Sequence, residues 1–129
     1  STKGTIWKPH LLKSVDAAVG SGSVIDHKDA LTYQVEERPA YLDLVHAGLK
    51  GVIYDEAEAQ ASHFTNLSVK VAGKTGTAEN SGEDHAWFIG SAEIKGRKTA
   101  FAILVENSGG GGTEAAPIAR KLLEKLQDD

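Results

Sequence analysis

The fold of this chain is decided by the segment Val69-Lys70-Val71-Ala72-Gly73-Lys74-Thr75-Gly76-Thr77-Ala78-Glu79. The segment begins with the alternating apolar pattern of a strand, with Val69 and Val71 on one face. It continues into small, hydroxylated and cationic residues, where Gly73 and Gly76 flank a Lys-Thr step. Glycine weakens a strand interior and usually marks a place where a ligand or another backbone comes close. The segment therefore predicts a strand that carries a binding site.

Two further strands and a helix are expected after this segment. The runs 85–90 and 99–106 are strand-like, and the connection around Gly96 is short enough to close them as a hairpin. The second run is apolar on both faces, which is typical of a central strand covered on both sides. Thr113 is expected to cap a helix whose first turn tolerates Pro117. The apolar face of this helix, which is expected to lie on the sheet, consists of Ala116, Ala119, Leu122, Leu123 and Leu126.

A second amphipathic helix is expected before the segment. Pro39 offers its start, and the apolar residues that follow are spaced three, four, three and one positions apart, ending near Tyr54. These residues are Leu42, Val45, Leu49, Val52 and Ile53. Gly48 and Gly51 lie inside this helix and lower its propensity by about 1 kcal/mol each relative to Ala. Their presence predicts close packing against a neighbouring element.

The first 35 residues predict short extended pieces. The runs 5–8 and 11–15 read as strands separated by Pro9, which cannot donate a ladder hydrogen bond. Residues 17–29 are rich in Gly, Ser and Asp, as in a loop or exposed hairpin, and 31–35 returns as a strand.

Composition places the chain among globular proteins with one core. Its 129 residues, 40% hydrophobic and 25% charged, are too few for two ordinary domains. The net charge of −4, without a basic cluster, argues against a nucleic-acid partner. The absence of cysteine excludes a disulfide framework and a thiolate zinc site. No apolar run approaches the roughly 20 residues that span a bilayer, so any anchoring segment is expected outside this chain.

The step Gly73-Lys74-Thr75 also invites comparison with a Walker phosphate loop. That motif requires a glycine five residues before Gly73, where this chain has Ser68, and it must open a helix. Nucleotide binding is therefore not expected.

Neither the histidines nor the glycine run predicts a ligand site. The five histidines are 17 to 22 residues apart, so no pair has the spacing that places two ligands on one helix face. No metal and no cofactor are expected. The four glycines at 109–112 precede a helix and are suited to cradling an anion, but a flexible connection explains them better.

The opening segment also has another interpretation. Lys-Thr-Gly-Thr on a strand is the third sequence motif of serine acyltransferases that recognise penicillin. Further blocks accompany it in order, at 4–12, 72–79, 85–90, 104–107 and 115–120. In this order and spacing the chain closely resembles the C-terminal part of penicillin-binding protein transpeptidase domains, over nearly its whole length. The blocks 105–107 and 116–120 look most like class B enzymes of the cell-elongation type.

The resemblance implies a fold of the α/β class, of α+β type. An antiparallel sheet of about three main strands carries the C-terminal helix, as part of a penicillin-binding or β-lactamase-like transpeptidase fold. Residues 1–129 are then the C-terminal portion of a single transpeptidase domain. In the family two more strands complete the sheet beside the Ile103 strand, so an unpaired edge is expected, which can drive self-association.

Two other motifs of the family, Ser-x-x-Lys and Ser-x-Asn, do not occur in the chain. The family places both before Lys-Thr-Gly, and they supply the nucleophile, its base and part of the hydrogen-bond network. The chain is therefore expected to be a fragment that is inactive alone.

The resemblance assigns roles to four residues. Lys74, read as catalytic, supplies positive charge to the serine–lysine–serine network and to the substrate carboxylate. Thr75 and Thr77 donate hydroxyl hydrogen bonds to that carboxylate. The backbone N–H of Thr77, also read as catalytic, is an oxyanion donor. Gly76 lets a substrate backbone approach and pair along the strand edge.

The resemblance implies a peptidoglycan D,D-transpeptidase of the serine type. A serine attacks the carbonyl between two terminal D-alanines of a stem peptide, and an amine of a neighbouring stem takes the acyl group. The implied partners are stem peptides, β-lactams that mimic them, and cell-wall elongation proteins. The implied location is extracytoplasmic, with an N-terminal transmembrane anchor outside this chain.

Two alternatives remain open. One is a non-catalytic module that binds peptidoglycan or a partner, and the other is a β-lactamase or β-lactam sensor domain. The upstream gene sequence distinguishes them, because an anchor, a pedestal and Ser-x-x-Lys favour the transpeptidase.

Overall fold

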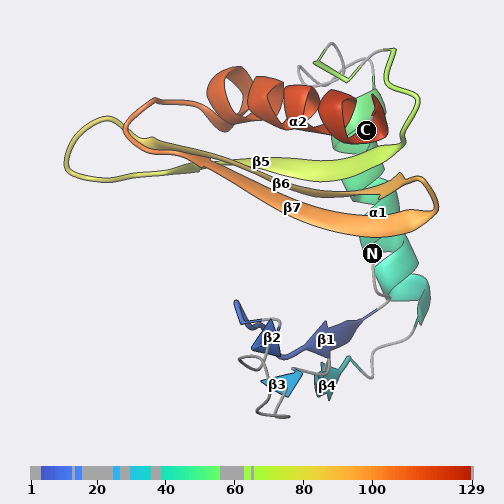
Figure 1. The fold of residues 1–129 in the computed structure, drawn as a ribbon. Coiled ribbons are helices and arrows are strands. Elements are labelled where there is room, and N and C mark those ends of the chain that lie inside the picture. The colour runs from blue at the N-terminus through green and yellow to red at the C-terminus, as the bar shows by residue number, and fades with distance from the viewer. Residues whose placement is uncertain are drawn as a thin grey trace.

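A three-stranded antiparallel sheet with a helix on each side forms the main body of the molecule (Figure 1). The computed structural model describes residues 4–12, 14–15, 25–26, 30–35, 39–55, 63–64 and 66–128. The sheet consists of β5 (Val71–Ala78), β6 (His85–Ile94) and β7 (Arg97–Val105), in the order β5-β6-β7. Helix α2 (Ala116–Asp128) packs on β6 and β7, and α1 (Pro39–Tyr54) packs against β5. This arrangement confirms the predicted meander and both predicted helices.

A smaller N-terminal part lies apart from the sheet and is joined to it through α1 (Figure 1). It contains two antiparallel pairs, made by β1 (Thr5–Trp7) with β4 (Leu31–Gln34) and by β2 (Ser14–Val15) with β3 (Ile25–Asp26). The strands expected at 5–8 and 31–35 are confirmed. The one expected at 11–15 is shorter, and most of the loop expected at 17–29 lies outside the described residues.

The sheet follows from local sequence signals. β5 and β6 pair from Val71↔Ala92 to Ala78↔His85 without a bulge. β6 and β7 are joined by Lys95 and Gly96, whose φ angles of 51° and 76° are both positive. Two such residues form the tight turn whose twist matches that of paired strands.

β7 corrects one expectation about the sheet. Among the described strands it pairs with β6 alone, so it lies at an edge and not at the centre. Alternate side chains along it, from Lys98 to Leu104, are exposed. One face of β7 is therefore exposed in this chain, although both of its faces are apolar. The expected unpaired edge is present among the described strands.

The core lies between the sheet and α2. Phe88 is fully buried, and its ring stacks on Phe64 at 5.3 Å and on Phe101 at 5.9 Å between ring centroids. Ala116, Ala119 and Leu123 of α2 are buried against it, whereas Leu122 and Leu126 at the margin of the same face remain more than a third exposed.

α1 reaches this core only through its C-terminal end. Ile53 is fully buried, and the hydroxyl of Tyr54 accepts a hydrogen bond of 2.8 Å from the N–H of Val71 at the start of β5. A Cβ added at Gly48 or Gly51 meets no atom of the described residues within 4 Å. The expectation that these glycines mark close packing is therefore wrong, because no described element lies against that face.

The connection from β7 to α2 also differs from expectation. A π-helical turn, η2 (Gly111–Ala115), precedes α2, and its N-cap is Gly110, so the predicted cap at Thr113 is wrong. The hydroxyl of Thr113 instead donates to the carbonyl of Gly110 at 3.0 Å. Gly111 is buried, so the glycine run is packed against the body of the molecule and is not a free connection.

Candidate active site

The four predicted site residues lie side by side in β5, in the half that leads towards Ala78. β6 borders them on one side through the pairs Lys74↔Ile89, Thr75↔Phe88, Gly76↔Trp87 and Thr77↔Ala86. The other edge of β5 has no partner among the described strands. An edge strand presents backbone N–H and C=O groups that can pair with an additional extended chain.

Lys74 and Thr75 meet at this open edge. Successive side chains of a strand point to opposite faces, so Lys74 and Gly76 share one face with Ala72, and Thr75 and Thr77 share the other. Yet the Lys74 Nζ lies 3.0 Å from the carbonyl oxygen of Thr75 and 3.4 Å from its Oγ1. Because β6 closes the opposite edge, the ammonium reaches Thr75 around the open one. The edge therefore gathers a positive charge and a hydroxyl.

The two glycines of the segment have different reasons for lacking a side chain. A Cβ at Gly73 would lie 2.7 Å from the Phe88 ring and 2.8 Å from the carbonyl oxygen of Ile89. Core packing therefore requires Gly73, and no ligand needs to be invoked there. A Cβ at Gly76 would meet the Trp87 Cβ at 3.3 Å, which is tight but is the one contact within 4 Å that it makes with the described residues.

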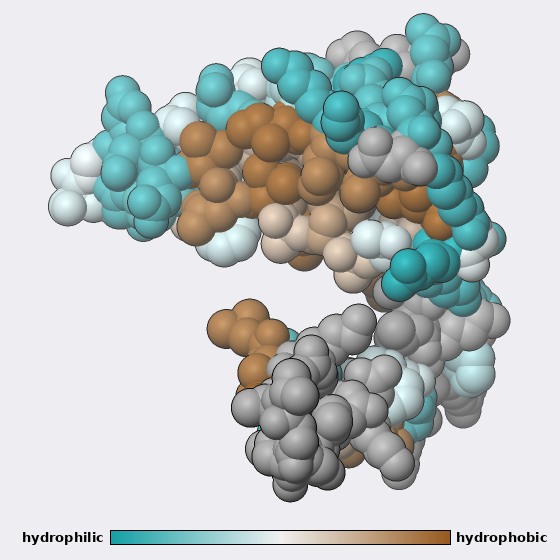
Figure 2. Space-filling view, in the orientation of Figure 1, coloured by the Kyte–Doolittle hydropathy of each residue, from teal (hydrophilic) through white to brown (hydrophobic). Residues whose placement is uncertain are grey.

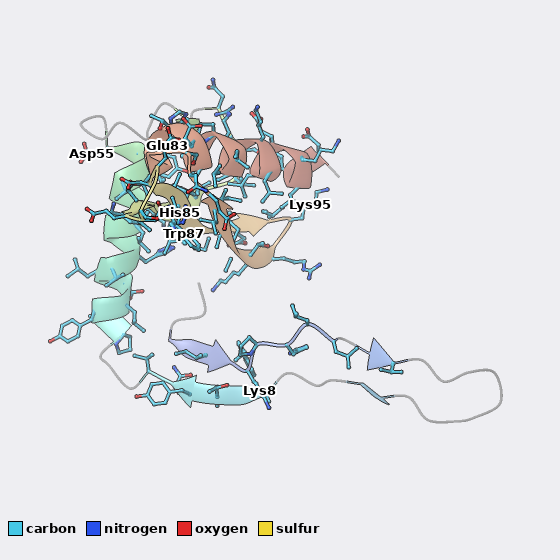
Figure 3. The ribbon with its side chains drawn as sticks, turned by 90° about the vertical axis from the view of Figure 1, so that its left-hand side faces the viewer. Lys8, Asp55, Glu83, His85, Trp87 and Lys95 are labelled. Carbon is cyan, nitrogen blue, oxygen red and sulfur yellow. The ribbon has the colours of Figure 1, made fainter. Side chains whose placement is uncertain are left out.

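A polar cluster borders the end of β5, and sequence reasoning gave it no role. The side-chain nitrogen of Asn80 donates to the side-chain oxygen of Asn107 at 3.0 Å, and the Asn107 N–H donates to Nδ1 of His85 at 3.0 Å. Figure 3 shows His85 and Trp87 close together on β6. No spacing pattern in the sequence links positions 80, 85 and 107, because strand pairing brings them together.

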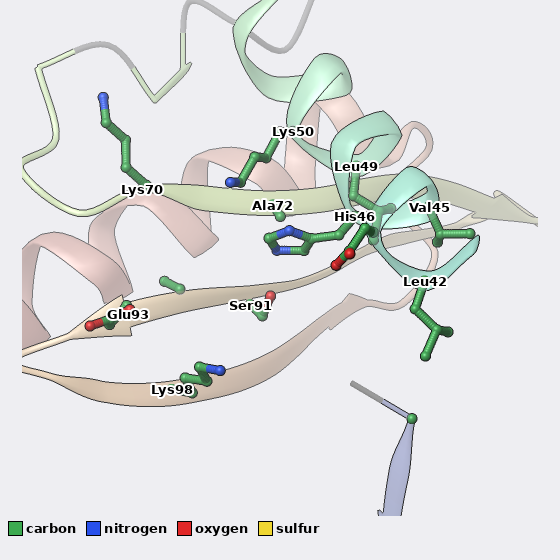
Figure 4. Close-up of a pocket in the computed structure, with 13 residues that line it drawn as sticks. Leu42, Val45, His46, Leu49, Lys50, Lys70, Ala72, Ser91, Glu93 and Lys98 are labelled. Atoms are coloured by element: carbon green, nitrogen blue, oxygen red, sulfur yellow. The ribbon is translucent and has the colours of Figure 1, made fainter. Parts of the chain in front are cut away.

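A hollow of about 320 Å³ lies between α1 and the sheet (Figure 4). Its lining combines apolar side chains of α1 with the cationic side chains of Lys50, Lys70 and Lys98 and the carboxylates of Asp43 and Glu93. Burial, together with the positive charge of Lys50, lowers the pKa of His46 in this wall below 6.5. None of the residues 74–77 lines the hollow, but Ala72 does, so the hollow and Lys74 lie on the same face of β5.

Within the described residues, no three His, Cys, Asp or Glu side chains are grouped as metal ligands. The helices of the same residues are too short or too polar to cross a bilayer.

The comparison with known families decides what the segment belongs to. The family described as penicillin binding protein transpeptidase domain matches residues 1–124. The chain belongs to this family. The resemblance carried by the Lys-Thr-Gly-Thr segment and its accompanying blocks is thereby confirmed.

Curated relatives match this transpeptidase-domain chain, one over most of its length and another over less than half of it. The peptidoglycan D,D-transpeptidase MrdA of Haemophilus influenzae is 30% identical over 139 residues, which cover 94% of this chain and 21% of the relative. The peptidoglycan D,D-transpeptidase PbpA of Mycobacterium tuberculosis is 44% identical over 66 residues, which cover 43% of this chain and 13% of the relative. The chain thus spans about a fifth, or less, of these relatives.

Solved structures agree with the fold. Penicillin-binding protein A from M. tuberculosis, determined as an imipenem acyl-enzyme complex, has a TM-score of 0.71 and 27% identity over 96% of this chain and 28% of that one. Pseudomonas aeruginosa PBP2 in complex with WCK 5153 has a TM-score of 0.70 and 27% identity over 95% of this chain and 26% of that one. The predicted α+β transpeptidase fold, with an antiparallel sheet and a C-terminal helix, is confirmed.

Proposed function

We propose that this chain is the C-terminal portion of the transpeptidase domain of a longer, serine-type peptidoglycan D,D-transpeptidase. The observation that carries the proposal is the Lys74 ammonium held beside the Thr75 hydroxyl at the edge of β5 that no described strand pairs with. The names of the relatives, MrdA and PbpA, support the same assignment.

The first step of the proposed chemistry is recognition of the terminal carboxylate of a stem peptide. A carboxylate that arrives beside Thr75 takes over the Lys74 ammonium from the Thr75 carbonyl and accepts hydrogen bonds from the Thr75 and Thr77 hydroxyls. Hydrogen bonds between charged groups are roughly twice as strong as neutral ones, so this cluster sets the position of the peptide end. The peptide backbone then pairs along β5, where Gly76 leaves room for it.

The second step is acyl transfer. The serine hydroxyl of the remaining part of the protein attacks the carbonyl between two D-alanines, and its proton passes to a base. The base then gives this proton to the leaving nitrogen as the C–N bond breaks and D-alanine is released. The Thr77 N–H and the N–H of the serine stabilise the oxyanion that forms. An amine of a second stem peptide then attacks the acyl-serine, which forms the cross-link and restores the serine. A β-lactam acylates the same serine.

The nucleophile comes to this site from outside the chain. Lys74 shares a face of β5 with Ala72, which lines the hollow beside α1, so we place the nucleophile-bearing segment on that face. This placement accounts for a lysine site without a Ser-x-x-Lys motif. The chain alone then binds no β-lactam covalently.

Location and partners follow from the substrate. Peptidoglycan lies outside the cytoplasmic membrane, so the site faces that side, and we assign the parent protein an N-terminal membrane anchor. The resemblance to class B enzymes of the elongation type extends the proposal to partners in cell-wall elongation.

The test is acylation of the full-length protein by a fluorescent penicillin. Lys74→Ala is expected to reduce the second-order acylation rate by about 10²-fold or more, the loss typical of removing one preorganised electrostatic contact. Lys121→Ala, on the exposed side of α2, is the matched control and is expected to behave as wild type. Unchanged acylation in Lys74→Ala contradicts the site assignment, and acylation of the 129-residue chain alone contradicts the proposal that the nucleophile lies elsewhere.

A further inference from the structure

The first residue of η2 presses against the back of the proposed site. Gly111 is buried, and a Cβ added there would fall well inside 3.0 Å of the carbonyl oxygens of both Gly76 and Trp87. Real Cβ atoms do not approach other atoms so closely, so a side chain at this position requires either η2 or the β5–β6 pair to move. The adjacent Gly110 is different, because its added Cβ would meet the Thr113 Oγ1 at 3.4 Å, an ordinary contact.

The position of Gly111 is fixed by hydrogen bonds on both sides. Before it, the N–H groups of Ser108 and Gly109 both donate to the carbonyl of Asp84 at 2.9 Å, and Asn107 donates to His85. After it, the N–H groups of Thr113 and Glu114 donate back to the carbonyl of Gly110, which closes the turn of η2. The loop after β7 is thus tied to the start of β6 by Asn107, Ser108 and Gly109, and this tether opposes movement of η2 away from β5.

One of the two carbonyls, that of Gly76, belongs to the peptide unit that carries the proposed oxyanion donor. The carbonyl of Gly76 and the N–H of Thr77 belong to the same planar trans peptide, so they point in opposite directions and move together. Gly111 lies at the carbonyl end. The N–H at the other end, that of Thr77, is the group that stabilises the oxyanion in the proposed function. Any shift of the Gly76 carbonyl therefore tilts the Thr77 N–H.

We propose that Gly111 is a positioning residue: its bare backbone, packed on the Gly76–Thr77 peptide, holds the Thr77 N–H in the direction that acyl transfer requires. This inference rests on the proposed function. A methyl group at position 111 displaces the peptide by roughly 1 Å, and a misplacement of that size costs about 10²-fold in rate. Gly111 is thus part of the active-site wall, whereas the added Cβ of Gly110 meets no atom of β5 or β6 among its contacts.

The test compares Gly111→Ala with Gly110→Ala in the full-length protein. Stopped-flow acylation by a fluorescent penicillin, at varied concentration, separates the dissociation constant of the first complex from the acylation rate constant. Gly111→Ala is expected to lower the rate constant by about 10²-fold with a much smaller change in the dissociation constant. Gly110→Ala is expected to match wild type in both. A melting temperature for each variant separates misplacement from unfolding.

The outcomes distinguish this inference from the function on which it rests. A wild-type protein that is not acylated overturns the proposed function and the inference with it. Wild-type acylation with an unchanged rate constant in Gly111→Ala overturns the inference alone. If Gly111→Ala does not fold, Asn80→Ala loosens the same loop without added bulk, because it removes the hydrogen bond to Asn107. Its rate constant is expected to fall by more than its dissociation constant changes, and a wild-type rate constant overturns the inference.

Discussion

The guanidinium of Arg120 donates a 2.6 Å hydrogen bond to the carbonyl oxygen of His63, which joins α2 to the segment that places Phe64 in the core. The same side chain makes an ion pair with Glu124 one turn further along α2, also at 2.6 Å. The first bond links parts of the chain 57 positions apart, and the second is local.

Removal of Arg120 is expected to cost more than removal of its helix partner. Arg120→Ala leaves the His63 carbonyl without this charged donor, and we expect a loss of about 2 kcal/mol in the free energy of unfolding. Glu124→Ala removes a half-exposed pair of the i,i+4 type, which is worth about 0.5 kcal/mol. Urea unfolding followed by tryptophan fluorescence measures both. Equal losses for the two variants would show that the bond to His63 contributes nothing beyond the ion pair.

Phe88→Ala is expected to be the most damaging substitution in the sheet. Phe88 is fully buried between Phe64 and Phe101, and truncation of such a phenylalanine typically costs about 3–5 kcal/mol. The matched control is Ile89→Ala, whose side chain on the opposite face is 51% exposed and is expected to cost less than about 1 kcal/mol. Urea unfolding measures the loss of free energy of unfolding in each variant. Similar losses for Phe88→Ala and Ile89→Ala would contradict the assignment of the core to the Phe88 face of the sheet.

His46 is expected to make stability depend on pH. Burial and the positive charge of Lys50 lower its pKa in the folded protein below 6.5. The unfolded chain then binds more protons as the pH falls through 6.5, so folded-state stability is lost from that pH downwards until the lower folded pKa is passed.

The measurement compares the free energy of unfolding of wild type and His46→Gln between acidic and neutral pH. Wild type is expected to lose stability relative to the variant as the pH falls below 6.5, while the difference stays constant above it. The charges of Asp43 and Lys98 also affect the pKa of His46, the first raising it and the second lowering it. Both residues are present in wild type and in His46→Gln. A difference that does not vary with pH, or that changes in the opposite direction, refutes the prediction.

The isolated chain is expected to self-associate through β7. Figure 2 shows an apolar surface over the sheet and α2, and the residues around β7 that remain more than a third exposed include Leu104, Ile118 and Leu122. An unpaired edge beside such a surface pairs readily with another chain. Analytical ultracentrifugation is expected to show a mass that increases with concentration.

A lysine placed on the edge tests the cause of this association. Ala102→Lys, at an exposed position of β7, is expected to reduce association because charged side chains on an edge strand oppose pairing. Ala47→Lys, at an exposed position of α1, adds the same charge away from the edge and is expected to leave association unchanged. A chain that is monomeric at every concentration would contradict the prediction.

Several expectations were wrong where they depended on a neighbour outside the local segment. No described atom lies within 4 Å of a Cβ added at Gly48 or Gly51, although glycine inside a helix suggested a close partner. Thr113 is a residue type that often caps helices, but the helical turn begins at Gly111. At that position the close approach of β5 and β6 leaves no room for a side chain. A sequence pattern predicts which face of a helix is apolar and where a turn occurs. It does not predict which other element packs against that face or that turn.

The sequence by itself determined the elements and the position of the candidate site. Alternation, the Lys95-Gly96 turn and Pro39 are local signals, and Lys74 to Thr77 are consecutive, so a correctly placed strand is enough to bring them together. Only the tertiary structure decided which residues support them, namely Phe88 under Gly73, Gly111 behind Gly76, and the cluster of Asn80, His85 and Asn107. The physical reason is that local backbone geometry fixes how often side chains return to the same face of a strand or helix. A contact between residues tens of positions apart is instead fixed by strand register and by the close packing of the core.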